Sequence, residues 1–573
     1  MRLDVKFSAS LPAFRRAGVL ALALLAAGTL DSARADQEPP PAPPKVVIGA
    51  TAPPPPVEPP PTPPDGVWLT DESGRQYFTI QIPKQEGEYR WLDDHHIVLR
   101  YGMRHEVVTH DETTFTVKVF KTEGVPMSEP AKKVPTAEEL AAVAATYVHD
   151  ATDGDLLSFT RFDNGLPTSG QWRNGFEIAD MNGDGHLDIV HGPERKGGRH
   201  QPNIFLGDGK GNWQRWREAQ FPPLPYDYGD VAVGDYNGDR RPDLALAVHL
   251  AGVLVLVADG PASFKEWGKG VHFELPGQGG GAFSSRTIES ADWNGDSRTD
   301  LIVLGEGPRM SIGRSIKGQP DMRPANGYGM LVYLNRGDGS WEAKDERKNP
   351  RPVFGDDLEV ADLNGDRRMD AVLGLNVLGS KQVLRLGAAG GGWTVAELPG
   401  LRPRLLTLAV HVADLNGDRR KDLAIGYIAN ELGTWRTGID LFYARAKGEW
   451  ERRTLFAEEG RRGVFALDGG DLDGDGHHDL AALTGDGEVW VFLGRRGGAF
   501  VRETGSELPP RTGCRGYDVK LSDLDGDGRD ELVAAFAGEP SALFAPEKCT
   551  HNGSLQAWKV GARPEARASS GNP

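Results

Sequence analysis

The sequence predicts an all-β protein in which one small antiparallel sheet is repeated around a ring. Three observations predict this fold class. The nine-residue stretch "DMNGDGHLD" at residues 180–188 recurs six more times with small changes, and short apolar runs flank every copy. Glycine and proline, 74 and 41 of the 573 residues, favour many turns and short strands over long helices. A chain of this length also exceeds one ordinary core unless a repeat extends it.

The spacing and the neighbours of the copies define the repeat. The copies begin at Asp180, Asp235, Asp292, Asp362, Asp414, Asp471 and Asp523. The intervals are 55, 57, 70, 52, 57 and 52 residues, a period that requires a repeat architecture. A short strand such as "VHVAD" precedes each loop, two apolar strands follow it, and a fourth strand opens with an aromatic residue, as in "SWEAK". Four strands in roughly 50 residues make one blade of a β-propeller.

The two ends of the repeat region complement each other. The seventh copy stops after its third strand, "SLQAWKV" at 554–560, and has no fourth. A spare strand, "DLLSFTRFDNGLP" at 155–167, precedes the first loop. We therefore expect a seven-bladed propeller over 153–562, closed by its N-terminal strand so that no sheet edge stays open.

The residues before the propeller divide into four segments. Residues 1–35 read as a signal peptide, with two arginines, an apolar run and an A-x-A pattern that predicts cleavage after Ala35. The protein is therefore expected to be secreted, periplasmic or at the cell surface. Residues 36–65 form a Pro-rich linker, either a polyproline II spacer or a plain disordered segment.

A small antiparallel β domain is expected at 66–125, where apolar and polar residues alternate, followed by a helical connector at 126–152. Thr136 and Glu139 form a capping box there, and Leu140, Val143 and Tyr147 line one helix face. Residues 563–573 form a disordered tail.

Composition excludes several functional classes. The net charge of −17 argues against a nucleic-acid binder, and no segment after the leader is apolar enough to span a membrane. Only two cysteines occur, which excludes a disulfide-dense scaffold and Cys-rich zinc modules. In an oxidising compartment Cys514 and Cys549 are expected to pair, and the alternative is two separate buried thiols. We expect a monomer.

The repeated loop has the composition of a cation site. It reads D-x-[DN]-G-D-x-x-x-[DE], and oxygens at positions 1, 3, 5 and 9 with the backbone carbonyl of position 7 suit Ca²⁺. Such hard ligands disfavour zinc and copper. The alternative is that Asp and Asn simply form turns without metal. The candidate ligands are Asp180, Asn182, Asp184, His186 and Asp188; Asp235, Asn237, Asp239, Arg241 and Asp243; Asp292, Asn294, Asp296, Arg298 and Asp300; Asp362, Asn364, Asp366, Arg368 and Asp370; Asp414, Asn416, Asp418, Arg420 and Asp422; Asp471, Asp473, Asp475, His477 and Asp479; and Asp523, Asp525, Asp527, Arg529 and Glu531.

Sequence differences between the copies predict an order of calcium affinity among the loops. Position 6 is glycine in loops one, six and seven, but Arg240, Ser297, Arg367 and Arg419 occupy it elsewhere. A tight turn there prefers glycine, so these four loops are expected to be strained. Loops six and seven carry a fourth acid, at position 3. We expect up to seven structural calcium ions, with loop six tightest and the second, fourth and fifth loops weaker.

This strand–loop–strand unit resembles the FG-GAP/VCBS repeats of integrin α-subunit heads and of many bacterial secreted proteins. The resemblance covers residues 153–562. It implies a calcium-binding propeller that acts as a binding or adhesion module.

The propeller face opposite the calcium loops is rich in arginine and aromatic residues. These suit carboxylate, sulfate or phosphate groups, so an acidic polysaccharide or an acidic protein partner is one hypothesis. The alternative is that the arginines pair with neighbouring acids. The candidate ligand-binding residues are Trp172, Arg173, Tyr228, Arg286, Arg351, Arg402, Arg404, Arg462 and Arg515.

An enzyme, such as a polysaccharide lyase or hydrolase on a calcium propeller, is the second hypothesis. No motif such as G-x-S-x-G or H-E-x-x-H occurs, and the abundant acids are already assigned to metal. No catalytic residue is therefore assigned.

Overall fold

The structure is a computed structural model in which most residues from 136 to 562 and six short stretches before them are described. The described residues are 69–72, 76–83, 89–93, 96–99, 104–111, 113–120, 136–194, 200–224, 229–248, 252–268, 271, 285–305, 329–346, 353–538, 549 and 552–562. The predicted signal peptide, Pro-rich linker and C-terminal tail lie outside the described residues.

A six-stranded antiparallel sheet lies within 66–125, where the alternating pattern predicted strands. Its order is β1-β2-β6-β5-β4-β3. Its small core contains Ile97, Phe115 and Val117. The strands are β1 (Leu69–Thr70), β2 (Gln76–Pro83), β3 (Tyr89–Asp93), β4 (His96–Leu99), β5 (Arg104–His110) and β6 (Thr114–Phe120).

Helix α1 (Ala137–Ala145) begins at the predicted capping box, since Thr136 and Glu139 each bond to the other's backbone N–H. The helix buries none of its own residues, and Leu140 is exposed rather than part of a buried face. Val143 and Tyr147 pack against an apolar cluster of the propeller, and the hydroxyl of Tyr147 donates to Glu431 at 3.0 Å. Among the described residues, no helix combines the length and apolar character needed to cross a membrane.

Seven sheets built from antiparallel strands follow, each with one copy of the acidic loop between its first and second strands. In the second strands the residues are buried on both faces, as in all six of "DLALAV". The sheets are β9 (Phe176–Ala179), β10 (Asp188–His191), β11 (Asn203–Gly207) and β12 (Trp213–Arg215); β13 (Val231–Gly234), β14 (Asp243–Val248), β15 (Gly252–Gly260) and β16 (Ser263–Glu266); β17 (Ser285–Ala291), β18 (Asp300–Gly305), β19 (Met330–Asn335) and β20 (Trp341–Asp345); β21 (Gly355–Ala361), β22 (Asp370–Leu375), β23 (Leu384–Gly387) and β24 (Trp393–Ala396); β25 (Leu405–Ala413), β26 (Asp422–Glu431), β27 (Thr434–Ala444) and β28 (Trp450–Glu459); β29 (Val464–Gly470), β30 (Asp479–Thr484), β31 (Val489–Arg495) and β32 (Ala499–Glu503); and β33 (Arg515–Ser522), β34 (Glu531–Ala537), β35 (Gly553–Ala562) and β8 (Leu157–Arg161). Two 3₁₀ turns, Ala389–Gly391 and Ala446–Gly448, precede the fourth strands of the fourth and fifth sheets.

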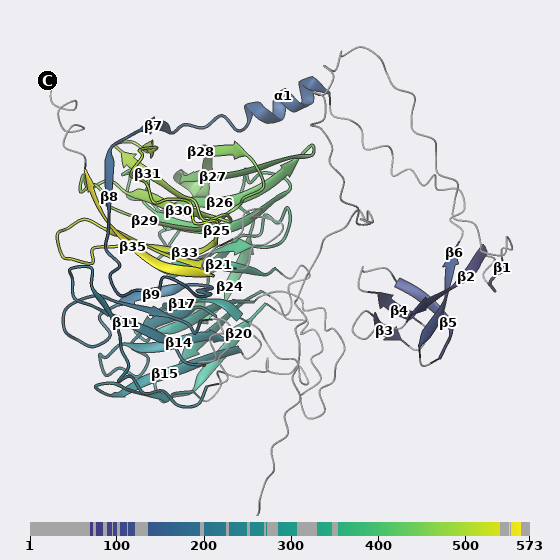
Figure 1. Ribbon diagram of the computed structural model, residues 1–573, viewed down its shortest axis with the longest axis horizontal. Coiled ribbons are helices and arrows are strands. Elements are labelled where there is room, and N and C mark those ends of the chain that lie inside the picture. Colours follow the sequence, from purple (N-terminus) through teal and green to yellow (C-terminus); the bar gives the residue numbers. More distant parts are fainter. Residues whose placement is uncertain are drawn as a thin grey trace, which may run out of the picture. The chain divides into compact units, whose positions relative to one another are not determined.

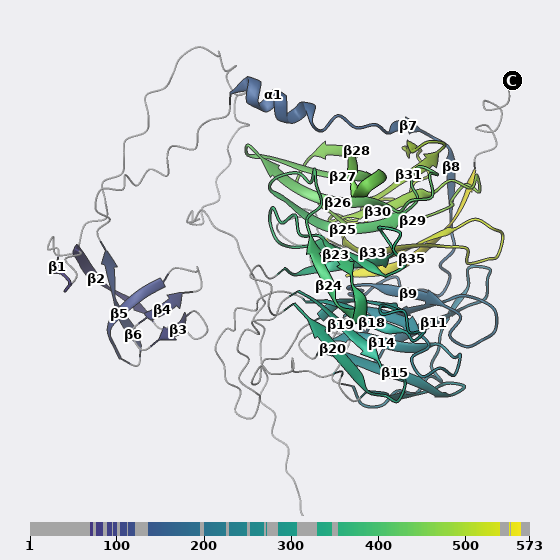
Figure 2. The same ribbon diagram turned by 180° about the vertical axis from the view of Figure 1, so that it is seen from behind.

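The sheets form a closed ring around their first strands. The first strand of each sheet contacts the first strand of the next, and β33 contacts β9. Figures 1 and 2 show the stacked sheets from opposite sides. This arrangement is that of a β-propeller, as the repeat predicted.

The N-terminal strand completes the last sheet, as predicted. β8 pairs antiparallel with β35, with Phe159 opposite Val560, and the dark blue β8 lies beside the yellow β35 in Figure 1. An apolar cluster joins Phe176 and Ile189 of the first sheet to Val533 and Leu555 of the seventh. One feature was not predicted: β7 (Thr152–Gly154) adds to β32 as a parallel fifth strand of the sixth sheet.

Candidate metal sites

All seven loops share one backbone arrangement that is organised by their first aspartate. In loop one, Asp180 Oδ1 accepts the N–H of Asp184 at 3.1 Å and its Oδ2 accepts the N–H of Gly185 at 2.9 Å. The equivalent pair of hydrogen bonds recurs in every other loop. The repeated sequence therefore produces a repeated, preformed loop.

The acid at position 9 anchors each loop to its sheet. Asp188 is fully buried; its Oδ2 accepts the N–H of Met181 at 2.8 Å and its Oδ1 that of Gly207 on β11 at 2.9 Å. The first of these bonds recurs in all seven loops and the second in the first six. Each carboxylate oxygen has a second lone pair, so these bonds leave room for a cation.

Burial makes the position 9 acids expensive to ionise. Desolvation raises the pKa of Asp188, Asp243 and Asp300 to about 6. It raises the pKa of Asp422 and Glu531 to about 7 and that of Asp479 to about 8. In each case the neighbouring acids of the same loop raise the pKa further. A divalent cation beside these groups favours their charged form and removes this cost.

The position 6 residues confirm the predicted turn geometry. Glycine occupies it with φ of 87°, 78° and 85° in loops one, six and seven. The non-glycine residues there, Arg240, Ser297, Arg367 and Arg419, have φ of 66°, 66°, 67° and 70°. These four loops therefore hold a left-handed residue that glycine would adopt more easily.

The acids converge most closely in loops six and seven. Oxygens of Asp471, Asp473 and Asp479 lie within 4.8 Å of one another, and so do those of Asp523, Asp525 and Glu531. In loop three, Asn294 Oδ1 is buried without a hydrogen-bond partner. An oxygen left in this way inside a ring of acids fits a metal ligand.

Basic side chains near the loops were missed by the sequence reasoning. Arg495, at the end of β31, lies 3.0 Å from Asp473 and 2.9 Å from Asp475 in loop six. Lys559 on β35 pairs with Asp525 and Asp527 in loop seven. Both lie on the third strand of their repeat, where the sequence alone does not show that their side chains reach the loop. The two loops with an extra acid therefore also have an internal counter-charge.

Position 7 arginines provide a second kind of local pairing. Each binds the position 5 aspartate of its own loop, with Arg368 at 3.1 Å from Asp366 as an example. The other pairs are Arg241–Asp239, Arg298–Asp296, Arg420–Asp418 and Arg529–Asp527. The side chains of these residues thus balance the loop acids, while their backbone carbonyls remain the predicted ligands.

Two residues proposed for the ligand-binding face are buried, which corrects that assignment. Arg402 is 2% exposed and binds Asp440 at 2.7 Å, beside the ring of Tyr147. Trp172 is 4% exposed and packs edge-on against His191 and Phe205. Burial of these side chains excludes direct contact with a partner.

The remaining candidates on that face differ in their surroundings. Arg462 pairs with Glu458 and Glu488, and Arg286 with Asp356 at 3.2 Å, as the pairing alternative predicted. Arg404 is exposed with φ of 58°. Tyr228 and Arg351 lie outside the described residues.

Arg515 and Arg173 belong to one stacked group. The guanidinium of Arg515 lies 3.9 Å from the ring centre of Phe465 and 4.6 Å from that of Tyr517. Arg173 lies 5.6 Å from the same tyrosine ring. Residues of the sixth and seventh sheets thus meet the connector that leads into the first sheet. Close by, Cys514 and Cys549 form the predicted disulfide.

Comparison with known families agrees with the repeated loops. A family model described as FG-GAP-like repeat matches residues 196–246 and 471–534. The chain contains FG-GAP-like repeats. The matched ranges hold the second, sixth and seventh loops, so the FG-GAP-like match coincides with the acidic motif.

No curated protein sequence matches this FG-GAP-like chain. Solved structures similar to it include a Dos1 propeller, at 12% identity and a TM-score of 0.37, covering 71% of this chain and 95% of that one. An α-L-arabinofuranosidase, Arb93A from Fusarium graminearum, is 10% identical with a TM-score of 0.37, covering 70% and 98%. A thermostable family-43 glycoside hydrolase is 10% identical with a TM-score of 0.28, covering 58% and 92%.

Proposed function

We propose that the protein is a secreted, calcium-stabilised β-propeller that acts as a binding module. The observation that carries this proposal is the sevenfold recurrence of one preformed oxygen-rich loop at the first hairpin of every sheet. A turn needs no such set of acids, and burying their charge is costly without a cation. The metal-free alternative explains one loop more easily than seven.

The residues present fit calcium. Positions 1, 3, 5 and 9 offer carboxylate or amide oxygens, and the carbonyl of position 7 completes an oxygen-only set. When bound, the ion supplies positive charge to the loop acids. The protein's own residues do the rest: the first aspartate shapes the loop, and the buried position 9 acid ties it to the second and third strands. The role of the sites is therefore structural.

Secretion is supported by the disulfide. Cys514 and Cys549 are bonded, and such bonds persist in oxidising compartments. The predicted leader at 1–35 agrees with this location.

Chelation tests the calcium proposal. When the free Ca²⁺ concentration is a hundred times the Kd of a site, binding at that site adds about 2.7 kcal/mol to the free energy of unfolding. With several sites, we expect excess EDTA to lower the Tm by on the order of 10 °C or more. Adding Ca²⁺ should restore the Tm, and Mg²⁺ should restore less of it. An unchanged Tm, together with no stoichiometric calcium by elemental analysis, would contradict the proposal.

For the partner, we propose an anionic glycan or an acidic protein surface. The stacked group of Arg515, Tyr517 and Arg173 supports this, because an arginine held flat on aromatic rings presents its donors in a fixed plane. Arg404 adds an exposed guanidinium on the same class of connector.

The partner is tested with an array of acidic glycans in calcium buffer. Arg515→Glu and Arg404→Glu should each reduce binding at least tenfold, and Arg453→Glu on the outer strand β28 serves as the matched charge control. Equal loss in all three variants would indicate non-specific attraction. No acidic glycan retained by the folded wild type would leave an acidic protein as the partner.

A further inference from the structure

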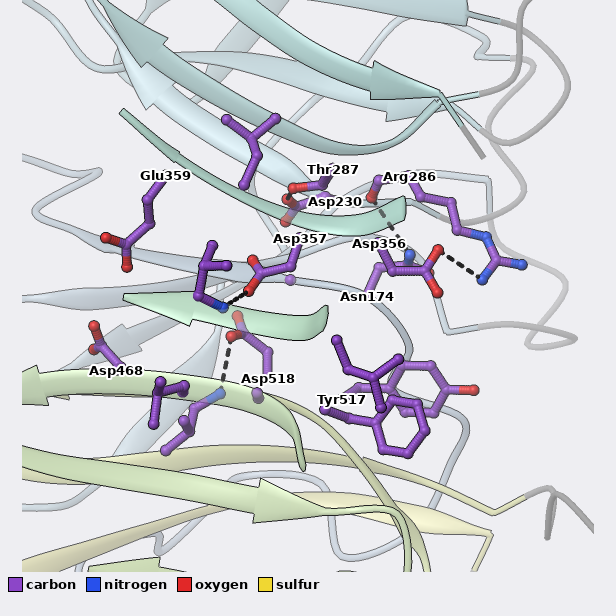
Figure 3. A pocket seen from close by; sticks show the side chains of 18 of the residues that line it. Asn174, Asp230, Arg286, Thr287, Asp356, Asp357, Glu359, Asp468, Tyr517 and Asp518 are labelled. Atoms are coloured by element: carbon purple, nitrogen blue, oxygen red, sulfur yellow. Dashed lines mark hydrogen bonds and ion pairs between the residues drawn. The ribbon is translucent and has the colours of Figure 1, made fainter. Parts of the chain in front are cut away.

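A central cavity of about 320 Å³, rich in charged side chains, is lined by six of the first strands and by residues just before them, including Asp230 next to β13. Aligning the repeats on the first loop aspartate shows that one ring of residues lies three positions earlier. This ring consists of Glu177, Ala232, Glu289, Glu359, His411, Asp468 and Lys520. A second ring, five positions before the loop, contains Asp230, Asp357 and Asp518. Figure 3 shows Glu359 and Asp468 at one end of the cavity and Arg286, Asp356 and Tyr517 at the other.

Several of these carboxylates join neighbouring sheets. Asp518 accepts the N–H of Phe176 at 2.9 Å, Asp230 that of Ile288 at 3.2 Å, and Asp357 that of Val410 at 2.8 Å. Adjacent first strands form no backbone ladder with each other, so side-chain oxygens satisfy these donors. The second ring is thereby explained by the fold itself.

In the first ring, three side chains from adjacent sheets lie close together, and the hydrogen bonds that join the sheets do not explain this cluster. Glu359 Oε1 lies 2.9 Å from His411 Nδ1, and Asp468 Oδ1 lies 3.5 Å from the same nitrogen. The three ligand atoms lie within 4.8 Å of one another. His411 is buried, with 7% of its surface exposed, so its ring is held in a fixed place.

Each member of this triad is oriented by a second contact. The other oxygen of Glu359 accepts the N–H of Val412 at 2.6 Å, and the other oxygen of Asp468 accepts that of Leu521 at 2.7 Å. His411 Nε2 lies 2.8 Å from His478 Nε2, and the two rings are stacked 5.1 Å apart. Contacts of this kind fix metal ligands in proteins, because they set both the ring orientation and the tautomer.

The charge of the cavity favours a cation. Eight carboxylates line it (Glu177, Asp230, Glu289, Asp356, Asp357, Glu359, Asp468 and Asp518), against three basic side chains (Arg286, Arg515 and Lys520). Burial raises the pKa of Asp230 and Asp357 to about 7, which shows how costly the excess negative charge is. Lys520 lies 3.6 Å from Glu177, and its charge also acts on Asp468, where burial raises the pKa and Lys520 partly lowers it. The eight carboxylates still outnumber the three basic side chains, so the cavity lining carries an excess of acidic groups.

We propose that Glu359, His411 and Asp468 form a transition-metal site at the wall of the central cavity, distinct from the seven proposed calcium loops. The imidazole nitrogen decides the ion class. Oxygen-only loops select Ca²⁺, whereas an imidazole with two carboxylates suits Zn²⁺ and related first-row ions. Three protein ligands leave a further coordination position for water or another ligand.

The test uses the full-length protein in calcium buffer, which keeps the loops filled. Zn²⁺ titration by calorimetry should show one tight site per chain, and Co²⁺ should give the visible absorption bands of a nitrogen-containing site. His411→Gln should weaken Zn²⁺ binding at least tenfold and abolish the Co²⁺ bands. His149→Gln, an exposed histidine elsewhere, is the matched control and should change neither.

A second variant keeps the proposal falsifiable if His411→Gln does not fold. Glu359→Gln retains an acceptor for the N–H of Val412 but loses a charged ligand, so Zn²⁺ binding should again fall at least tenfold. Tight binding that survives both substitutions would overturn the site. So would a wild type without a tight Zn²⁺ site, in which case the triad is only a hydrogen-bonded network. A loss of calcium stabilisation alone would bear on the loops and not on this site.

Discussion

Loops five and six lie in adjacent sheets and have nearly the same backbone, yet they balance their charges differently. In both, the first aspartate accepts the N–H groups of positions 5 and 6, and the position 9 acid is fully buried. Loop six has Asp473 where loop five has Asn416, and Gly476 where loop five has Arg419. The shared hydrogen bonds therefore set the backbone of the loop, and the residues at positions 3 and 6 change its charge and its turn.

The basic side chains near the two loops also differ. Arg495 lies 3.0 Å from Asp473, the acid that loop five lacks. Its counterpart Arg445 comes only to 3.9 Å from Asp418. Loop five instead has Arg420 at position 7, which lies 3.2 Å from Asp418, where loop six has His477. The two loops therefore place their nearest basic side chain on different parts of the repeat: loop six on the third strand, loop five within the loop itself.

Removing the position 9 anchor should have the largest effect, and it should be equal in the two loops. Asp479→Ala and Asp422→Ala each leave two buried N–H groups without acceptors. The free energy of unfolding should fall by about 3 kcal/mol or more in either variant. Urea unfolding in excess EDTA isolates this metal-independent part. A clearly smaller loss in one loop would show that the anchors are not equivalent.

Removing the basic side chain of the third strand should change the calcium affinity of loop six more than that of loop five. Arg495→Gln frees Asp473 and Asp475, so the calcium affinity of loop six should rise several-fold, while the chelated protein loses up to about 1 kcal/mol. Arg445→Gln should change loop five less, since its contact is longer. Calorimetric calcium titration of both variants measures this. Unchanged affinity in the first would mean that Arg495 leaves the loop when the ion binds.

Local patterns in the sequence predicted most of the fold. The acidic motif located the first hairpin of each sheet, and the capping box located the start of α1. The missing fourth strand of the last repeat predicted its pairing with a strand in 155–167, and β8 lies within that range. All depend on residues near one another in the chain or on a repeat. β7 was not predicted because a strand of three residues is too short to show an alternation of apolar and polar residues.

Charged side chains were predicted less well, because their partners are distant in sequence. Arg402 was placed on a ligand face, but Asp440 on β27 pairs with it in the interior. The triad was missed because nothing in one repeat shows that the residue three before the loop faces the axis. Reading that column across all seven repeats would have found Glu359, His411 and Asp468 together.

The position 6 turn should give the smallest effect, with opposite signs in the two loops. Arg419 has φ of 70°, so Arg419→Gly should relieve strain and stabilise the protein by about 0.5 kcal/mol, part of the gain being offset by the greater freedom of glycine when unfolded. Gly476→Ala should cost about 1 kcal/mol. No atom lies within 4 Å of a Cβ placed at Gly476, so this cost is conformational and not steric. Thermal melts of both variants, with calcium and with EDTA, decide the matter: if Arg419→Gly destabilises the protein in both buffers, the backbone of loop five does not carry the strain that its dihedral angle indicates.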